Sequence, residues 1–128
     1  MIKKILVFSM IVASFYACGD DSNKGTTATD KPAVEDITKN PDYQKGLELI
    51  GKSDCLTCHK IEEASTGPAY RDVANKYTND DKTIIMLSEK IIKGGTGNWG
   101  QVPMVAHPAL SSDDAKQIVK FILLLKNK

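Results

Sequence analysis

Cys55-Leu56-Thr57-Cys58-His59 is the stretch of sequence that decides how this chain is interpreted. Two residues separate the two thiols, and a histidine follows the second thiol directly. This C-x-x-C-H spacing is the attachment motif of c-type haem, in which both sulfurs add across the vinyl groups of one porphyrin. The histidine then lies under the iron and donates an imidazole nitrogen. The motif predicts one covalent haem c, attached through Cys55 and Cys58 and ligated by His59.

Three other uses of these cysteines are chemically possible. A thioredoxin-like redox pair needs a βαβ context, and no run of alternating apolar and polar residues here is convincing as a strand. A structural zinc site needs four ligands, whereas Cys55, Cys58 and His59 supply three. A plain disulfide stays possible in an exported protein. The export signal and the helical pattern described below favour haem attachment.

The N-terminus has the three-part pattern of a secretory signal peptide. A basic head at residues 1–4 precedes an almost purely apolar run at residues 5–16. The apolar run is too short for a transmembrane helix, which needs about 20 residues. We therefore predict a signal peptide at residues 1–17 and an exported protein.

The unpaired third cysteine follows this apolar run directly, in Ala17-Cys18-Gly19. A cysteine after a small residue at this place resembles the lipobox of bacterial lipoproteins, although Phe15 and Tyr16 are bulkier than usual lipobox residues. In that family the signal is cut before the cysteine, and the thiol takes a lipid. We predict lipidation of Cys18; the alternative is an ordinary signal peptide cut nearby, with Cys18 a free thiol.

The rest of the chain divides into a polar segment and one folded domain. Residues 18–40 are rich in Asp, Ser, Asn, Thr and Lys, with too few apolar residues to fold alone. We predict a lipid-anchored flexible tether at residues 18–40 and a folded domain at residues 41–128. A core of this size is marginal unaided, and a large covalent cofactor would supply what it lacks.

The charges of the chain are nearly balanced, with 17 basic against 16 acidic side chains. This balance argues against a nucleic-acid binder, which normally carries a marked basic excess.

The apolar residues of the folded domain recur at helical spacing. The third expected helix ends at the glycines of positions 94 and 95. Ser111 can cap the last helix, with Asp114 three residues further on in a capping-box arrangement. Helices are expected at about residues 41–52, 68–77, 81–93 and from 111 to the end. The predicted fold class is all-α.

A second axial ligand for the haem iron could come from Met86, Met104 or His107. Met86 lies within an expected helix among isoleucines, where core packing is its expected role. Met104 ends a glycine- and proline-containing loop at residues 97–104, which can bend over a flat haem edge. Its thioether favours ferrous iron. We predict Met104 as the ligand, with His107 at the surface or near the haem rim.

Residues 42–126 resemble the short bacterial class I cytochromes c, which are mono-haem electron carriers. The resemblance rests on the segments at residues 55–59, 67–74, 98–104 and 112–115. It implies a small class I cytochrome c fold of about four helices around one covalent haem, with His59 and Met104 as axial ligands.

The resemblance also implies roles for residues around the haem. The backbone carbonyl of Pro68 would accept a hydrogen bond from the other nitrogen of His59. The Trp99 indole, and with it Lys90, would approach the haem propionates. Relatives can place an asparagine amide near the axial sulfur, where this chain has His107. The first and last helices would cross at Gly46.

The implied function is electron transfer, not enzymatic catalysis, because two filled axial positions leave the iron no open site. The expected partners are a redox donor and acceptor, such as an oxidase, a reductase or a quinol-oxidising complex. The lipid anchor would hold the protein on the periplasmic side of a bacterial membrane. The alternatives are a haem-bearing subunit of a larger respiratory complex, and a haem sensor or peroxidase-like protein in which Met104 is displaced.

Overall fold

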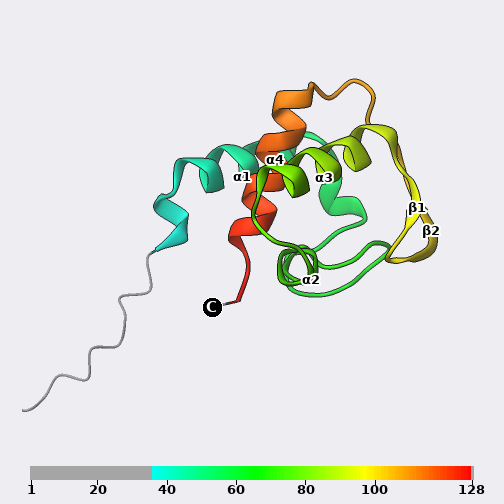
Figure 1. Cartoon of the computed structure of the whole chain (residues 1–128), viewed down its shortest axis with the longest axis horizontal. Helices are drawn as coiled ribbons and strands as arrows, with labels where there is room; N and C mark the ends of the chain where they lie inside the picture. Colours follow the sequence, from blue (N-terminus) through cyan, green and yellow to red (C-terminus); the bar gives the residue numbers. More distant parts are fainter. Residues whose placement is uncertain (1–35, 128) are drawn as a thin grey trace, which may run out of the picture. The chain divides into compact units, whose positions relative to one another are not determined.

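The computed structural model describes residues 36–127 (Figure 1). The predicted signal peptide, Cys18 and the first part of the predicted tether lie outside these residues. The elements in chain order are η1 (Ile37–Lys39), α1 (Pro41–Lys52), η2 (Cys55–Thr57), α2 (Tyr70–Lys76), α3 (Asp81–Lys93), β1 (Gly95–Gly97), β2 (Gly100–Met104) and α4 (Ser112–Leu124). No helix within residues 36–127 is long and apolar enough to cross a membrane.

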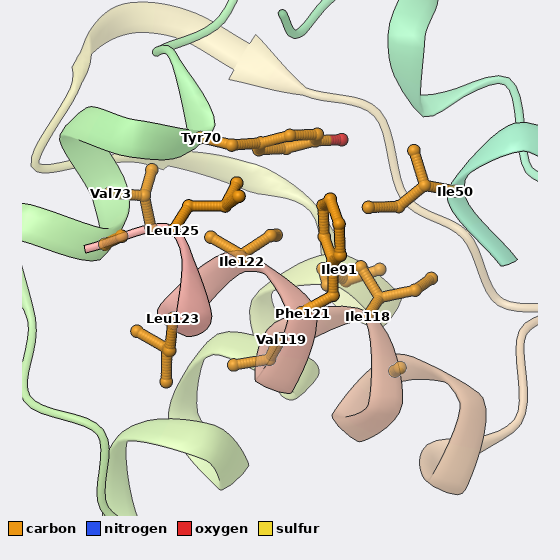
Figure 2. Close-up of a cluster of buried hydrophobic side chains, with 12 residues drawn as sticks. Ile50, Tyr70, Val73, Ile91, Ile118, Val119, Phe121, Ile122, Leu123 and Leu125 are labelled. Atoms are coloured by element: carbon orange, nitrogen blue, oxygen red, sulfur yellow. The ribbon is translucent and has the colours of Figure 1, made fainter. Parts of the chain in front are cut away.

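Helix α4 is the centre of the domain, because it packs against α1, α2 and α3 (Figure 1). Apolar residues at helical spacing along and just after this helix are buried: Ala115, Ile118, Val119, Ile122 and Leu125. Figure 2 shows the resulting cluster of buried side chains, to which α1, α2 and α3 also contribute. Its members are Ile50, Tyr70, Val73, Ala74, Ile91, Ala115, Ile118, Val119, Phe121, Ile122, Leu123 and Leu125.

Side-chain caps set where three of the helices begin. The carboxamide of Asn40 accepts a hydrogen bond from the Asp42 N–H at 2.8 Å at the start of α1. The Asp114 N–H donates to the Ser111 hydroxyl at 3.1 Å, and this hydroxyl donates to the Asp114 carboxylate at 2.7 Å. The predicted Ser111 cap of α4 is therefore present, with the Asp114 carboxylate bonded to the Ser111 hydroxyl and not to the Ser111 backbone N–H that a full capping box uses. The Asp80 carboxylate caps α3 by accepting a hydrogen bond from the Thr83 N–H at 2.8 Å.

Helix α2 begins at Tyr70, two residues later than predicted. Ala69 has extended backbone angles, with φ −61° and ψ 143°. The carbonyl of Pro68 accepts a hydrogen bond from the His59 side chain instead of one from within the helix. A proline at the start of a helix is a weak guide to the boundary when its neighbour is extended.

The loop predicted to carry Met104 is a β-hairpin, so the expectation of no strands was wrong. Strands β1 and β2 pair antiparallel, with Gly95 opposite Met104 and Gly97 opposite Gly100. All residues of β1 and most of β2 are exposed, so no apolar alternation marks them in the sequence. Gly95 and Gly100 have φ of 94° and 111°, which other residues rarely adopt.

The segment before α1 contributes to the domain. Residues 36–40, the end of the predicted tether, contain η1, and Ile37 packs against the core. The Gln44 side chain donates to the carbonyl of Thr38 at 3.2 Å. This turn therefore lies against α1.

Candidate cofactor site

A cavity of about 700 Å³ opens between the Cys55–His59 segment and the hairpin. Its volume falls in the range of about 300–1,000 Å³ that is usual for cofactor sites. Its walls come from η2, the loop before α2, and parts of α2, α3, α4 and the hairpin. They include Cys55, Cys58, His59, Gly67, Pro68, Tyr70, Tyr77, Met86, Lys90, Trp99, Val102, Met104, Val105, His107, Ile118 and Ile122.

A tight turn brings the three motif residues onto one wall of this cavity. Asp54 has a left-handed backbone, with φ 47° and ψ 10°, and starts the turn η2. The carbonyl of Cys55 then accepts bonds from the N–H groups of Cys58 at 3.3 Å and His59 at 3.0 Å. Both thiols are free, and burial raises the pKa of the Cys55 thiol.

The alternative uses of the cysteines find no support in the described part of the chain. Cys55 and Cys58 form no disulfide. No group of three or more His, Cys, Asp or Glu side chains in residues 36–127 could hold a metal ion by itself. The hairpin is the sheet of the described residues, and it is not part of a βαβ unit.

Three contacts surround the imidazole of His59. Its Nδ1 lies 2.8 Å from the carbonyl oxygen of Pro68, which only a donor can satisfy, so Nδ1 carries the proton. The ring of Tyr70 stacks on the imidazole with centroids 5.1 Å apart and planes 15° from parallel. A Cβ at Gly67 would lie 2.5 Å from the imidazole Cε1. Nε2 is therefore the nitrogen left with a lone pair for iron.

Two thioethers line the same cavity. Met104 ends β2, is half-buried and packs against the core cluster. Met86 on α3 is 46% exposed, so the expectation that it packs in the core was wrong. The buried positions of α3 are taken by Thr83, Ser88 and Ile91, which turns Met86 away from the core.

Trp99 and Lys90 both lie in the cavity wall. Trp99 sits in the turn of the hairpin, 42% exposed, with the Lys76 ammonium 4.4 Å from the ring centroid. This distance allows a cation–π interaction. The Lys90 ammonium donates to the carbonyls of Gly95 at 2.7 Å and Thr96 at 2.6 Å. An ammonium has three donors, so one N–H of Lys90 is left for another acceptor.

His107 is half-buried and lies in the cavity wall. From the sequence, we expected it at the surface or near the haem rim. Its backbone N–H donates to the carbonyls of Ile91 and Ile92, both at 3.2 Å. Its side-chain Nδ1 is buried without a hydrogen-bond partner. Buried polar atoms normally have a partner, so this nitrogen fits a cavity that is completed by a bound group.

Tyr70 and the packing of Gly67 against the imidazole were missed from the sequence. Both residues stand in the 67–74 segment, but nothing in their spacing indicates a contact with His59. Tyr70 is 4% exposed, and burial, followed by its place beside Cys55, raises the pKa of its hydroxyl well above the ordinary value.

The donor set of this cavity fits haem c. Two free thiols and an imidazole share one wall, with apolar side chains and a thioether elsewhere in the lining. Soft sulfur and imidazole nitrogen are the usual axial ligands of low-spin haem iron. Gly67 leaves the room that the imidazole occupies.

Comparisons with known proteins agree with this chemistry. The family model described as "Cytochrome c" matches residues 43–126. Cytochrome c-551 of Allochromatium vinosum is 44% identical over 87 residues, covering 68% of this chain and 93% of that protein. Cytochrome c-552 of Nitrosomonas europaea is 40% identical over 83 residues, covering 65% of this chain and 81% of that protein.

A solved structure shows the same fold. The crystal structure of wild-type Nitrosomonas europaea cytochrome c552 aligns with a TM-score of 0.59 and 40% identity, covering 62% of this chain and 99% of that one. The predicted short class I cytochrome c fold is thereby confirmed. The chain belongs to the cytochrome c family of electron carriers, and its cofactor is one covalent haem c.

Proposed function

We propose that this protein moves single electrons between respiratory redox proteins on the outer side of the cytoplasmic membrane. The observation that carries the proposal is the convergence on one cavity of Cys55, Cys58, His59 and Met104. The bound haem supplies a one-electron couple between ferric and ferrous iron. The chain's residues attach it, ligate it and surround it.

Each of the four residues has a distinct role in the proposal. Cys55 and Cys58 form the two thioether bonds, and the turn η2 holds their sulfurs on the same wall. His59 ligates through Nε2, because Nδ1 donates to Pro68. That second bond fixes the tautomer and raises the basicity of the ligand. Met104 supplies a neutral thioether, which raises the reduction potential by favouring ferrous iron.

Trp99 and Lys90 are proposed to meet the polar edge of the haem. The Trp99 indole N–H and the remaining N–H of Lys90 are donors for propionate oxygens. Lys90 also ties the end of α3 to β1 through two carbonyls. Lys90, which lines the cavity, thereby holds the hairpin that carries Met104 against α3.

Redox partners are proposed to approach the exposed apolar side chains at the mouth of the cavity. Val102 is 64% exposed and Val105 71% exposed, and both line the cavity. Leu56, within the attachment motif, is 50% exposed. Electron-transfer encounters are small and short-lived, which suits a patch of this kind. An oxidase, a reductase or a quinol-oxidising complex could supply the donor or acceptor.

The N-terminal sequence supports a membrane anchor. We propose a lipoprotein signal peptide at residues 1–17, lipidation of Cys18, a tether that follows it and ends before η1, and a cytochrome domain that includes η1 and residues 41–128. The protein would then work on the periplasmic side of a bacterial membrane. Cys18→Ser should move it from the membrane fraction to the soluble periplasmic fraction. Unchanged membrane association of that variant would contradict the anchor.

The ligand assignment is tested by comparing Met104→Ala with Met86→Ala in the holoprotein. Met104→Ala should abolish the long-wavelength absorption band of methionine-ligated ferric haem and lower the midpoint potential. Met86→Ala should leave both unchanged, although its side chain lines the same cavity. The reverse result would make Met86 the ligand. Carbon monoxide should leave the spectrum of the reduced wild type unchanged; a shift would favour a sensor or peroxidase-like role with a displaceable methionine.

A further inference from the structure

Tyr70 stacks on the proposed iron ligand His59 and is not itself one of the proposed ligands. We propose that Tyr70 is a positioning residue whose ring fixes the plane of the His59 imidazole. The inference rests on the proposed function, because it takes His59 as an axial ligand. If Tyr70 fixes this plane, a residue that does not bind the iron influences the electronic structure of the haem.

The geometry of the pair is that of a stacked contact. The ring centroids are 5.1 Å apart and the planes differ by 15°. Aromatic rings in offset stacks have centroids about 4.5–7 Å apart. Among the aromatic rings in residues 36–127, Tyr70 is the one that stacks on His59.

Tyr70 is itself held firmly enough to act as a support. It is the first residue of α2, and its N–H donates to the carbonyl of Lys60 at 2.9 Å, just beyond the attachment motif. The residue is 4% exposed. Figure 2 shows the labelled core side chains, including Ile122 and Ile91, gathered along one side of the ring. The core thus backs the ring, and the imidazole stacks against it.

The other two contacts of His59 constrain its plane only in part. The hydrogen bond from Nδ1 to Pro68 fixes the position of one atom, and the ring can still turn about that bond. A Cβ at Gly67 would lie 2.5 Å from Cε1, 2.8 Å from Nδ1 and 3.0 Å from Nε2, so Gly67 lies over the face of the ring at Cε1 and limits its tilt at that end only. The Tyr70 ring is the nearly parallel aromatic surface against the imidazole, and so it resists turning of the whole plane.

The plane of an axial imidazole has a measurable electronic consequence. Its π orbital overlaps one of two nearly equivalent d orbitals of ferric iron, and the plane decides which one is raised. The unpaired electron density follows that choice. The g-values of the ferric protein and the order of its hyperfine-shifted haem methyl resonances therefore report the imidazole plane.

Three variants of the ferric holoprotein test the proposal. Tyr70→Phe keeps the ring and removes the hydroxyl that lies beside Cys55. Tyr70→Leu removes the ring. Tyr43→Leu is the matched control, because the Tyr43 ring packs against Phe121 in the core and is not among the residues that line the cavity. Tyr70→Leu should shift the g-values and reorder the haem methyl resonances, whereas the other two variants should retain the wild-type pattern.

Two results would overturn the proposal. Wild-type g-values and methyl order in a folded Tyr70→Leu protein would show that the ring does not set the plane. An equal change in Tyr70→Phe would assign the effect to the hydroxyl instead. If Tyr70→Leu does not fold, the reduced wild type decides: nuclear Overhauser effects between the Tyr70 and His59 rings are expected, and their absence overturns the stack.

The same spectra separate this inference from the proposed function. A low-spin ferric wild type with the methionine band supports the His59 and Met104 pair. Identical spectra across all variants would then remove only the role of Tyr70. A high-spin wild type would remove the axial pair, and the inference with it.

Discussion

Gly46 of α1 lies so close to α4 that a Cβ atom at its position would be 2.3 Å from the Cβ of Phe121. The same atom would lie 2.8 Å from the carbonyl oxygen of Gln117. The two helices therefore meet backbone to backbone, as the resemblance implied for the first and last helices. Tyr43 packs its ring against Phe121 beside this point, with centroids 4.9 Å apart.

Gly46→Ala should destabilise the protein by about 3 kcal/mol, the upper end of the usual overpacking range. The added methyl has no flexible neighbour to displace, because it meets a Cβ and a backbone carbonyl. Denaturant unfolding of the ferric holoprotein measures the effect. Gly51→Ala is the matched control in the same helix, since nothing lies within 4 Å of its added Cβ. It should stabilise by about 0.5–1 kcal/mol. Equal effects of the two substitutions on the unfolding free energy would contradict the crossing.

Gly67→Ala should disturb the iron ligand. The added Cβ would lie 2.5 Å from Cε1 and 2.8 Å from Nδ1 of His59. Gly67 is not among the glycines with positive φ, so an alanine meets no backbone strain and its effect comes from the imidazole alone. We expect altered ferric g-values and a changed midpoint potential. A wild-type spectrum in this variant would mean that the imidazole does not occupy the position described.

Arg71→Gln should loosen the C-terminal end of α4. The Arg71 guanidinium donates to the carbonyl of Leu125 at 2.6 Å and to the side chain of Asn127 at 3.1 Å, and it also pairs with Glu62. Loss of the bond to the buried Leu125 should cost roughly 1–2 kcal/mol of unfolding free energy, with the absorption spectrum unchanged.

The control for Arg71 is an exposed ion pair. Lys93→Gln removes a pair with Glu89 in which the two side chains are 72% and 56% exposed. Such pairs contribute little, and the unfolding free energy should change by no more than about 0.5 kcal/mol. Equal effects of the two substitutions would show that the carbonyl contact of Arg71 adds no stability.

Asp80→Asn should reduce the loss of stability in acid. The Thr78 hydroxyl, and then the Thr83 N–H at 2.8 Å, lower the pKa of the Asp80 carboxyl. Its contribution is complete above the pKa of an unfolded aspartate, about 3.9, and is lost as pH falls through the lower folded value. Unfolding free energies at neutral pH and at about pH 3 should therefore differ less in the variant than in the wild type.

Asp113→Asn controls for the change in net charge, since the Asp113 side chain is 94% exposed. If Asp80→Asn loses as much stability on acidification as the wild type, the ionised cap of α3 does not contribute.

Helix positions and the attachment chemistry could be predicted because both depend on short segments. The bounds of α1 and α3 agree with those expected from helical spacing and capping residues. The role of Met104 as a ligand stays a prediction, although the structure brings Met104 to the cavity that holds His59. The start of α2 was placed too early because the Pro68 carbonyl bonds to a residue nine positions away.

The sequence by itself determined which residues could attach and ligate a haem, because C-x-x-C-H is a local spacing. Only the tertiary structure decided how those residues are held. The stack of Tyr70 on His59, the exposure of Met86, the carbonyl partners of Lys90 and the buried nitrogen of His107 all come from packing between elements. Such contacts depend on how distant segments fold around one cavity. The pattern of residues within a single segment therefore cannot predict these contacts.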